Sequence, residues 1–383
     1  MAEHLFIEPL DVLYLRGNKL FGDAGSHGEA LMPPWPSVAA GAIRSRMLTD
    51  LGDIEAFKSG AEPADGPLGR ILGTPAEPGS FRLRLFTLAR RVKDEIEPLF
   101  PAPSDLIGSD DGQLGFVRPG DMPSGLRCSN PTPRLPVLAQ DKQGKAKSGL
   151  WLTADGLAAY LMGKKPAADQ VILSNALWAF DGRLGIALDA GKRSAEQGKI
   201  YTAETVALHG QVGFLASVVG AEGHLPGGGL LRLGGDGRGA AVSPCQPRFP
   251  EPDLGPVETT GRFRLILTSP GLFEQGWRLP GLDADGLWRG PDGCTARLAA
   301  ASVPRSQVIS GWDLAEKGSG YPKPALRAAP VGSVYWFEDF KGATASLRKL
   351  VSEGFWAISG YPDRQRRAEG FNNVMLAVNP EEA

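Results

Sequence analysis

Histidines are the first residues in this sequence that could perform catalysis. The four are His4, His27, His209 and His224. None belongs to an H-x-x-x-H, H-E-x-x-H or HD pattern, so the sequence lacks the ligand spacing of a metal hydrolase. His27 precedes the first predicted helix and is a candidate general base. A lone histidine in a loop is more often incidental to chemistry, so the histidines alone indicate no reaction.

The glycine-rich segment GGDGR at 234–238 is a candidate phosphate-binding turn. Gly234 and Gly235 allow backbone N–H groups to converge on an anion, and Arg238 would add positive charge. The alternative is a tight turn between two strands. A metal-binding GGDD motif is excluded, because Gly237 stands where the second carboxylate would be needed.

Basic residues in loops are the remaining candidates for binding a polyanion. Lys192, Arg193 and Lys199 lie in the loop GKRSAEQGK, where Glu196 is the only acid. Other candidates are Arg16 and Lys19 after the first strand, Arg44 and Arg46 on the first helix, Lys323 and Arg327 in GYPKPALRA, and the cluster Arg364, Arg366 and Arg367. Tyr14 and Trp35 could stack on bases, although burial is the more common fate of such side chains. Solvated surface charge is the competing interpretation for each basic group.

Hydrophobic periodicity predicts an α+β protein that carries these loops. Helices are expected at 38–51, with Ser37 as N-cap, at 153–163, closed by Gly163, and at 342–354. Strands are expected at 4–15, 81–92, 183–189, 200–209, 211–219, 262–269, 302–310, 332–338 and 374–378. Residues 52–80 and 101–150 are expected to be loops. The proline-rich segment 243–256 is the expected linker between two small domains.

Composition limits the classes of protein that fit. The 383 residues are 42% hydrophobic, and 41 basic residues against 43 acidic ones give a net charge of −2. No global positive field is present, so any nucleic-acid contact must come from local patches or be shared with a partner. Three widely spaced cysteines, Cys128, Cys245 and Cys294, fit a reducing cytosol. No signal peptide or membrane-spanning segment is expected.

Five segments, in order, resemble one known family. They are IEPLDVLYLRGNKLFG with PPWPSVAAGAIRS, FPAPSDLIG at 100–108, the central hairpin at 183–208, LLRLGGDGRGA at 230–240, and the segment from ISGWDLAEKGSG to VGSVYWF at 309–337. Together they resemble the subunit three family of the Cmr module in type III-B CRISPR systems, within the RAMP superfamily. One departure concerns the glycine loop that often ends RAMP proteins. Here Asn372 and Asn373 follow Gly370-Phe371, which puts direct backbone–phosphate contact there in doubt.

The resemblance implies a fold and a role. It implies two ferredoxin-like (RRM-like, RAMP) domains with long loop insertions, at 1–255 and 256–383. It also implies a cytoplasmic, non-catalytic subunit without cofactor or metal, which binds the 5′ repeat-derived tag of the guide RNA. Its expected protein partners are the large polymerase-like Cmr subunit and the first backbone subunit of the filament.

The expected RNA contacts combine the loops with the resemblance. They are Arg16, Lys19, Arg44, Lys192, Arg193, Gly234, Gly235, Arg238, Lys323 and Arg327. Two alternatives remain open. One is a metal-independent RAMP guide-processing ribonuclease with His27 as general base, and the other is an assembly scaffold without an RNA role.

Overall fold

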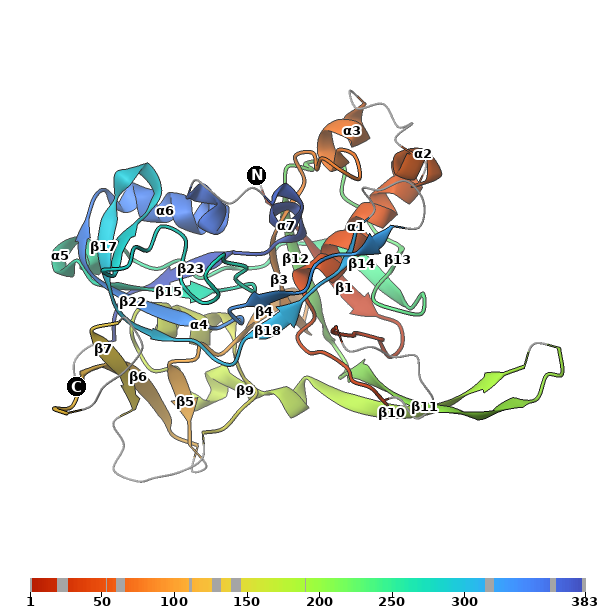
Figure 1. Cartoon of the computed structure of the whole chain (residues 1–383), viewed down its shortest axis with the longest axis horizontal. Coiled ribbons are helices and arrows are strands. Elements are labelled where there is room, and N and C mark those ends of the chain that lie inside the picture. Colours follow the sequence, from red (N-terminus) through yellow and green to blue (C-terminus); the bar gives the residue numbers. More distant parts are fainter. Residues whose placement is uncertain are drawn as a thin grey trace. The chain divides into compact units, whose positions relative to one another are not determined.

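The chain is a mixed α/β protein in which strands predominate. This computed structural model describes residues 2–18, 27–52, 54–59, 66–109, 112–125, 132–138, 146–189, 191–313, 320–358 and 363–380. The chain divides into two compact, discontinuous units. Unit 1 comprises 1–96, 175–246 and 308–326, and unit 2 comprises 97–174, 247–307 and 327–383. Figure 1 labels many of the elements of both units.

Five neighbouring strands of a larger antiparallel sheet form the centre of unit 1. Their order is β13-β14-β1-β12-β3. The strands are β1 (Glu3–Pro9), β3 (Arg82–Val92), β12 (Val212–Val219), β13 (Leu230–Arg232) and β14 (Gly239–Cys245). Strand β1 lies between β14 and β12, pairing Phe6 with Ser243 on one side and with Leu215 on the other. Burial along β12 is nearly continuous, as expected for a strand covered on both faces.

Three helices lie in unit 1 between β1 and β3. They are α1 (Pro36–Leu51), α2 (Ile54–Ser59) and α3 (Pro67–Leu72). Helix α1 begins two residues earlier than a Ser37 cap would allow: Trp35 is the N-cap, with no side-chain cap bond, and Pro36 occupies the first turn. The buried face of α1 includes Ala39, Ile43 and Met47.

A long hairpin extends from unit 1 (Figure 1). It consists of β10 (Trp178–Leu188) and β11 (Ala195–Leu208), which pair with each other in antiparallel register. Strand β2 (His27–Gly28) pairs with β11 in parallel, at Thr202 and Ala203 only. Most of the hairpin therefore has two strands. The short strands β18 (Gln307–Ile309), β19 (Trp312–Asp313), β20 (Tyr321–Pro322) and β21 (Leu326–Ala328) follow later in the chain, and β19 pairs with β20.

A second antiparallel sheet forms the centre of unit 2. Its order is β16-β17-β22-β15-β23. The strands are β15 (Phe263–Leu267), β16 (Leu287–Arg289), β17 (Thr295–Ser302), β22 (Val334–Lys341) and β23 (Val374–Ala377). The nearby helical segments are α5 (Gly255–Thr260), η3 (Pro291–Gly293), α6 (Thr344–Glu353), η4 (Gly354–Ala357) and α7 (Arg364–Glu369). Phe263 stacks on Phe337 at 5.0 Å between ring centroids, inside a core that includes Leu347 and Leu350 of α6.

Residues 97–174 form a layer of unit 2 with short strands and one helix. The elements are β4 (Glu95–Pro101), β5 (Leu106–Gly108), β6 (Leu114–Asp121), β7 (Arg134–Leu138), β8 (Leu150–Leu152), α4 (Ala154–Leu161), η1 (Ala168–Gln170), β9 (Val171–Leu173) and η2 (Ser174–Ala176). Thr153 caps α4 by accepting a hydrogen bond from the Gly156 amide at 3.1 Å. Helix α4 packs against β23, and β7 packs against β17. This layer groups with the C-terminal strands, whereas the division at 255/256 assigns it to the N-terminal part.

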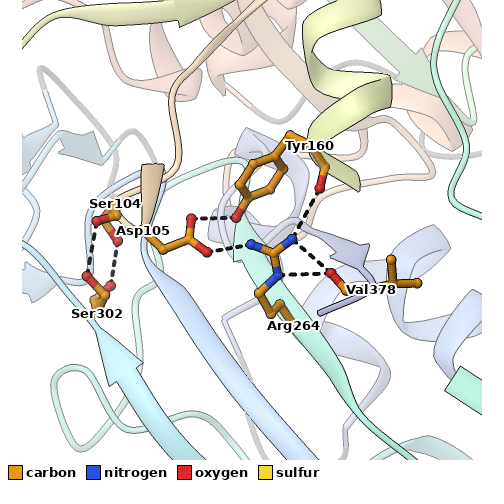
Figure 2. A network of polar contacts seen from close by, with 6 residues as sticks. All are labelled: Ser104, Asp105, Tyr160, Arg264, Ser302 and Val378. Carbon is orange, nitrogen blue, oxygen red and sulfur yellow. Dashed lines mark hydrogen bonds and ion pairs between the residues drawn. The ribbon is translucent and has the colours of Figure 1, made fainter. Parts of the chain in front are cut away.

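A buried ion pair fastens this layer to the second sheet (Figure 2). Arg264 Nη1 lies 2.5 Å from Asp105 Oδ2, and both side chains are fully buried. The remaining guanidinium nitrogens donate to carbonyl oxygens of Val378 (2.8 and 3.1 Å) and Tyr160 (3.1 Å). Tyr160 Oη donates to Asp105 Oδ1 at 2.6 Å. Each charge is therefore compensated by hydrogen bonds inside the protein, which is the condition for a buried pair to persist.

Most expected elements are present, and several differ in extent. The helices at 153–163 and 342–354 and the strands at 81–92, 211–219, 262–269 and 374–378 are confirmed within a few residues. Helices α2 and α3 contradict the loop expected at 52–80, and β5, β6 and β7 contradict the irregular segment expected at 101–150. Both hairpin strands are longer than expected, because β10 already pairs with β11 from Trp178 and β11 already begins at Ala195.

Candidate nucleic-acid interface

An open cleft of about 1450 Å³ lies within unit 1. It is bordered by helix α1, by residues 14–16 after β1, by β13 with the following glycine turn, and by Tyr201 of the hairpin. This volume exceeds the 300–1,000 Å³ that is typical of a site for one small ligand. The cleft therefore has room for an extended ligand rather than a single compact molecule.

Helix α1 faces the cleft with small and hydroxyl side chains. Ser37, Gly41, Ser45 and Thr49 recur at intervals of four residues, which places them in one row on the helix. A Cβ added at Gly41 would meet no atom within 4 Å, so the helix surface is open at that point. Such a row lets the backbone of a ligand approach closely, and the hydroxyls of Ser37 and Ser45 offer hydrogen bonds to it, whereas Thr49 Oγ1 donates to the carbonyl oxygen of Ser45 at 2.9 Å.

The arginines around the cleft are held in different ways. Arg46 Nε lies 2.7 Å from Asp50 Oδ1, and its Nη1 donates to the carbonyl oxygen of Leu230, so its position is fixed and its charge is compensated. Arg232 on β13 is exposed and forms no ion pair with any residue that the structure describes. Arg16 is also exposed beside the cleft. Arg16 and Arg232 are therefore the two exposed arginines that line this part of unit 1.

The GGDGR segment forms a tight turn that closes one side of the cleft. The Gly235 amide donates to the carbonyl oxygen of Tyr14 at 2.8 Å. Gly234 has a φ of +77°, and a Cβ there would lie 2.7 Å from the same oxygen, so glycine is required. Arg238 bonds Asp11 at 2.7 Å and lies over the Tyr14 ring at 5.2 Å. Gly234 and Gly235 line the cleft, whereas Arg238 serves the packing of the turn.

Other expected contact residues lie elsewhere. Arg44 Nη2 donates to the carbonyl oxygen of Leu72 at 3.3 Å, away from the cleft lining. Lys192 and Arg193 are exposed in the turn of the hairpin, which the Asp189 carboxylate stabilises by accepting from the Gly191 and Lys192 amides. Lys323 is half-buried in unit 1, Arg327 is exposed in unit 2, and Lys19 lies outside the described residues.

The C-terminal glycine loop uses its own amides internally. The amides of Phe371, Asn372 and Asn373 donate to Arg366 O, Pro270 O and Ser269 Oγ respectively. Asn372 adopts the left-handed conformation with a φ of +62°. Arg366 is buried and pairs with Glu369. These amides are not directed at an external phosphate.

Potential catalytic groups do not gather in one place among the described residues. His27 Nδ1 lies 2.9 Å from Thr202 Oγ1, and its Nε2 lies 3.8 Å from Glu204 Oε1. Burial lowers the pKa of His4 and raises that of Cys245 to about 11, so Cys245 is a neutral thiol at neutral pH. Within the same part of the chain, no group of three or more His, Cys, Asp or Glu side chains could hold a metal ion. No helix of that part is both long and apolar enough to cross a membrane.

Sequence reasoning missed part of the cleft. It did not select Arg232, Tyr201 or the row on α1, although Ser37, Gly41, Ser45 and Thr49 have a spacing that could have been noticed. Arg232 and Tyr201 carried no signal of their own, because each belongs to a strand whose position beside α1 depends on long-range pairing.

Comparison with known proteins identifies the family. The model of the family described as "CRISPR-associated protein (Cas_Cmr3)" matches residues 5–378. The chain belongs to the Cmr3 family. It is therefore related to the subunits that build type III-B CRISPR effector complexes, as the five sequence segments predicted.

Solved structures show distant likenesses to this Cmr3 family member. A chain in "Cryo-EM structure of the Type III-B Cmr-beta bound to cognate target RNA and AMPPnP, state 1" has a TM-score of 0.49 at 16% identity, covering 97% of this chain and 96% of that chain. A chain in "Crystal structure of Csm3-Csm4 subcomplex in the type III-A CRISPR-Cas interference complex" has a TM-score of 0.37 at 11% identity, covering 89% and 94%. The curated proteins contain no match.

Proposed function

We propose that the chain is a non-catalytic RNA-binding subunit whose unit 1 cleft holds the 5′ repeat-derived tag of the guide RNA. In this proposal it also bridges the large polymerase-like subunit to the first backbone subunit of the filament, in the cytoplasm. The observation that carries the proposal is the cleft itself. It combines a row of small residues on α1, two exposed arginines and two tyrosines.

The chemistry of the cleft suits single-stranded RNA. Arg16 and Arg232 can neutralise phosphates, and Ser37, in the first turn of the 16-residue helix α1, lies where the helix dipole favours an anion. Tyr14 and Tyr201 offer aromatic surface for bases. Of the two acids in the described lining of the cleft, Asp50 pairs with Arg46 and Asp236 pairs with Arg238 at 3.6 Å.

The order of the strands supports two ferredoxin-like modules. A βαββαβ module has the strand order 4-1-3-2. In the first sheet β14-β1-β12-β3 matches that order, with α1 as first helix, and in the second sheet β23-β15-β22-β17 matches it, with α6 as second helix. We therefore retain a division at 255/256 between the modules, with 97–174 as an insertion in the first module that belongs to the compact unit 2.

The test compares guide RNA with and without its tag. The double substitution Arg16→Ala and Arg232→Ala should weaken binding of tagged RNA by the full-length chain at least tenfold, since each removes a phosphate contact. Untagged RNA should bind weakly to wild type and variant alike. Arg70→Ala is the control, because Arg70 is exposed on α3 and lies outside the cleft lining.

Two outcomes would replace the proposal. Cleavage of RNA by the purified chain in EDTA, abolished by His27→Ala, would make the protein a metal-independent ribonuclease. Equal affinity for tagged and untagged RNA, or none even inside the assembled complex, would leave it an assembly scaffold. The basic turn of the hairpin is tested separately: charge reversal at Lys192 and Arg193 should weaken assembly on RNA if that turn contacts the guide.

A further inference from the structure

Arg46 connects helix α1 to strand β13 beside the cleft. Its Nε lies 2.7 Å from Asp50 Oδ1 and 2.8 Å from Asp50 Oδ2, one helical turn further along α1. Its Nη1 donates to the carbonyl oxygen of Leu230, which lies 184 positions away in the sequence. The Arg46 side chain is only 22% exposed. One guanidinium group therefore joins two elements that no local sequence pattern brings together.

The backbone just before β13 is shaped to admit this guanidinium group. Gly229 has a φ of +94°, and a Cβ built there would lie 3.2 Å from Arg46 Nη1 and 3.3 Å from its Nη2. Any other L-residue would be strained in this conformation and would crowd both nitrogens. Glycine at position 229 thus lets the chain pass close to Arg46 as it enters the strand.

Strand β13 is the edge of its sheet, and its outer side faces the cleft. The Gly229 carbonyl and the Leu233 amide bond β14 or the turn before it. Because backbone groups alternate in direction along a strand, those of Leu230 and Arg232 point away from β14. The contact from Arg46 to the Leu230 carbonyl is made on this outer side. Arg46 therefore occupies an acceptor that would otherwise stand at an open strand edge.

Arg46 and Arg232 have complementary situations in the same cleft. The charge of Arg46 is compensated by both oxygens of Asp50. Arg232 lies two residues after Leu230, is exposed, and forms no ion pair with a described residue. Strand β13 has only three residues, Leu230 to Arg232. Fixing Leu230 against α1 therefore also fixes the point from which the Arg232 side chain reaches into the cleft.

We propose that Arg46 is a positioning residue, which holds β13 against α1 and thereby places Arg232 to neutralise a phosphate of the guide RNA. Arg46 itself does not contact the RNA. This role rests on the proposed binding of the tag in the cleft, because a positioned arginine matters only where a phosphate lies. The contact with Leu230 also removes one carbonyl oxygen from an edge that faces a polyanion, and such an oxygen would repel phosphate.

Two other roles for Arg46 make different predictions. An arginine that contacts phosphate directly would contribute its own counterion release, independently of Arg232. An arginine that only stabilises α1 through an i,i+4 ion pair would change helix stability slightly and leave RNA binding unaltered. Only a positioning role couples the effect of Arg46 to the presence of Arg232.

The experiment is a double-mutant cycle on the full-length chain, with tagged guide RNA titrated at several salt concentrations. Arg46→Met and Arg232→Ala should each weaken binding about fivefold and reduce the slope of log Kobs against log salt by about 1, because each removes the same phosphate contact. The double variant should also be weakened about fivefold, since Arg46 acts through Arg232. Lys58→Met is the control and should bind like wild type, because Lys58 pairs with Glu55 at 2.9 Å on α2, outside the cleft lining.

A second variant separates charge from geometry. Arg46→Lys keeps the positive charge beside Asp50 but lacks the planar fork that holds Asp50 and Leu230 together, so it should behave like Arg46→Met. The lysine variant also provides the test if the methionine variant is unstable. Thermal unfolding of each variant shows whether the chain is folded under the conditions of the titration.

Additive losses would overturn the proposal. A double variant weakened about 25-fold, with a slope reduced by about 2, would mean that Arg46 contacts phosphate itself. Wild-type affinity of both Arg46 variants would likewise overturn it, since β13 would then be positioned without the arginine. Failure of the tag-binding proposal has another signature: Arg232→Ala alone would leave the affinity for tagged RNA unchanged.

Discussion

Arginine performs opposite tasks in the two units. Arg264 in unit 2 is fully buried, and each of its guanidinium nitrogens donates to a carboxylate or carbonyl oxygen (Figure 2). Arg232 in unit 1 is exposed beside the cleft and forms no ion pair with a described residue. A charge without water must be compensated by its own protein, whereas a charge left in water can be given to a ligand. Burial therefore separates structural arginines from candidate contacts better than loop position does.

The largest effect is expected from breaking the buried pair. Arg264→Met should reduce the free energy of unfolding by about 3–5 kcal/mol, because it leaves the Asp105 carboxylate buried and unpaired. Urea unfolding followed by circular dichroism measures it. Arg289→Met is the control, since Arg289 pairs with Asp283 at 2.8 Å on the surface of the same unit. Equal losses in the two variants would remove the distinction between buried and exposed pairs.

The hydroxyl of Tyr160 should have the next largest effect. Tyr160→Phe removes the donor to Asp105 Oδ1 and should cost about 1–3 kcal/mol, since it leaves a buried acceptor unsatisfied. Burial is the main reason that the pKa of Tyr160 lies well above 10.0. Because the pKa of Tyr160 is raised in the folded state, the stabilisation that its neutral hydroxyl contributes to folding is complete below pH 10. This stabilisation is lost as the pH rises above 10 toward the raised pKa.

The pH dependence tests that reasoning separately. Wild type should lose stability above pH 10 more steeply than Tyr160→Phe, as measured by thermal unfolding between pH 8 and pH 11. Tyr335, whose pKa is also raised by burial, remains in both proteins and contributes equally. Parallel pH profiles would show that Tyr160 ionises as freely in the folded chain as in the unfolded one.

Gly41 offers a gain of stability at the cleft. Gly41→Ala should stabilise the chain by about 0.5–1 kcal/mol, because alanine is the better helix former and its Cβ would meet no atom within 4 Å. Gly41→Trp should fill part of the cleft and weaken binding of tagged guide RNA without unfolding α1. Thermal unfolding and RNA titration separate the two effects. Full RNA affinity in the tryptophan variant would place the ligand elsewhere.

The smallest change in stability is expected at Arg232. Arg232→Ala should alter the free energy of unfolding by less than about 0.5 kcal/mol, since the side chain is exposed and has no ion-pair partner in the described part of the chain. It should nevertheless reduce the slope of log Kobs for guide RNA against log salt by about 1. Titrations at several salt concentrations measure the slope. An unchanged slope, or a loss of stability like that of Arg264→Met, would erase the contrast between the units.

Local patterns predicted many of the elements correctly. The alternation at 81–92 and the glycine that closes the helix expected at 153–163 act over a few residues, and each was confirmed as an element or boundary. The same patterns failed at 52–80 and 101–150, where short helices and strands depend on packing against distant segments. Ser37 was wrong as a cap because Pro36 is itself suited to the first helical turn.

The candidate RNA-contact residues also divide into those that local sequence could identify and those that it could not. Gly234 and Gly235 could be selected from the sequence, because glycine is required wherever backbones approach closely, and they line the cleft. Arg238 and Arg44 have the same side-chain chemistry as Arg232, yet Asp11 and the Leu72 carbonyl occupy them. A sequence shows which residues carry charge, but not which of them have internal partners.

The sequence by itself determined the family, the α+β composition and the strongest helices, since these depend on ordered motifs and on short-range periodicity. Only the tertiary structure decided which cations border the cleft, that 97–174 packs with unit 2, and that Arg46 joins helix α1 to strand β13. The physical reason is that burial and pairing arise from contacts between residues far apart in the chain. Arg264 meets Asp105 across 159 positions, and no local pattern records such a contact.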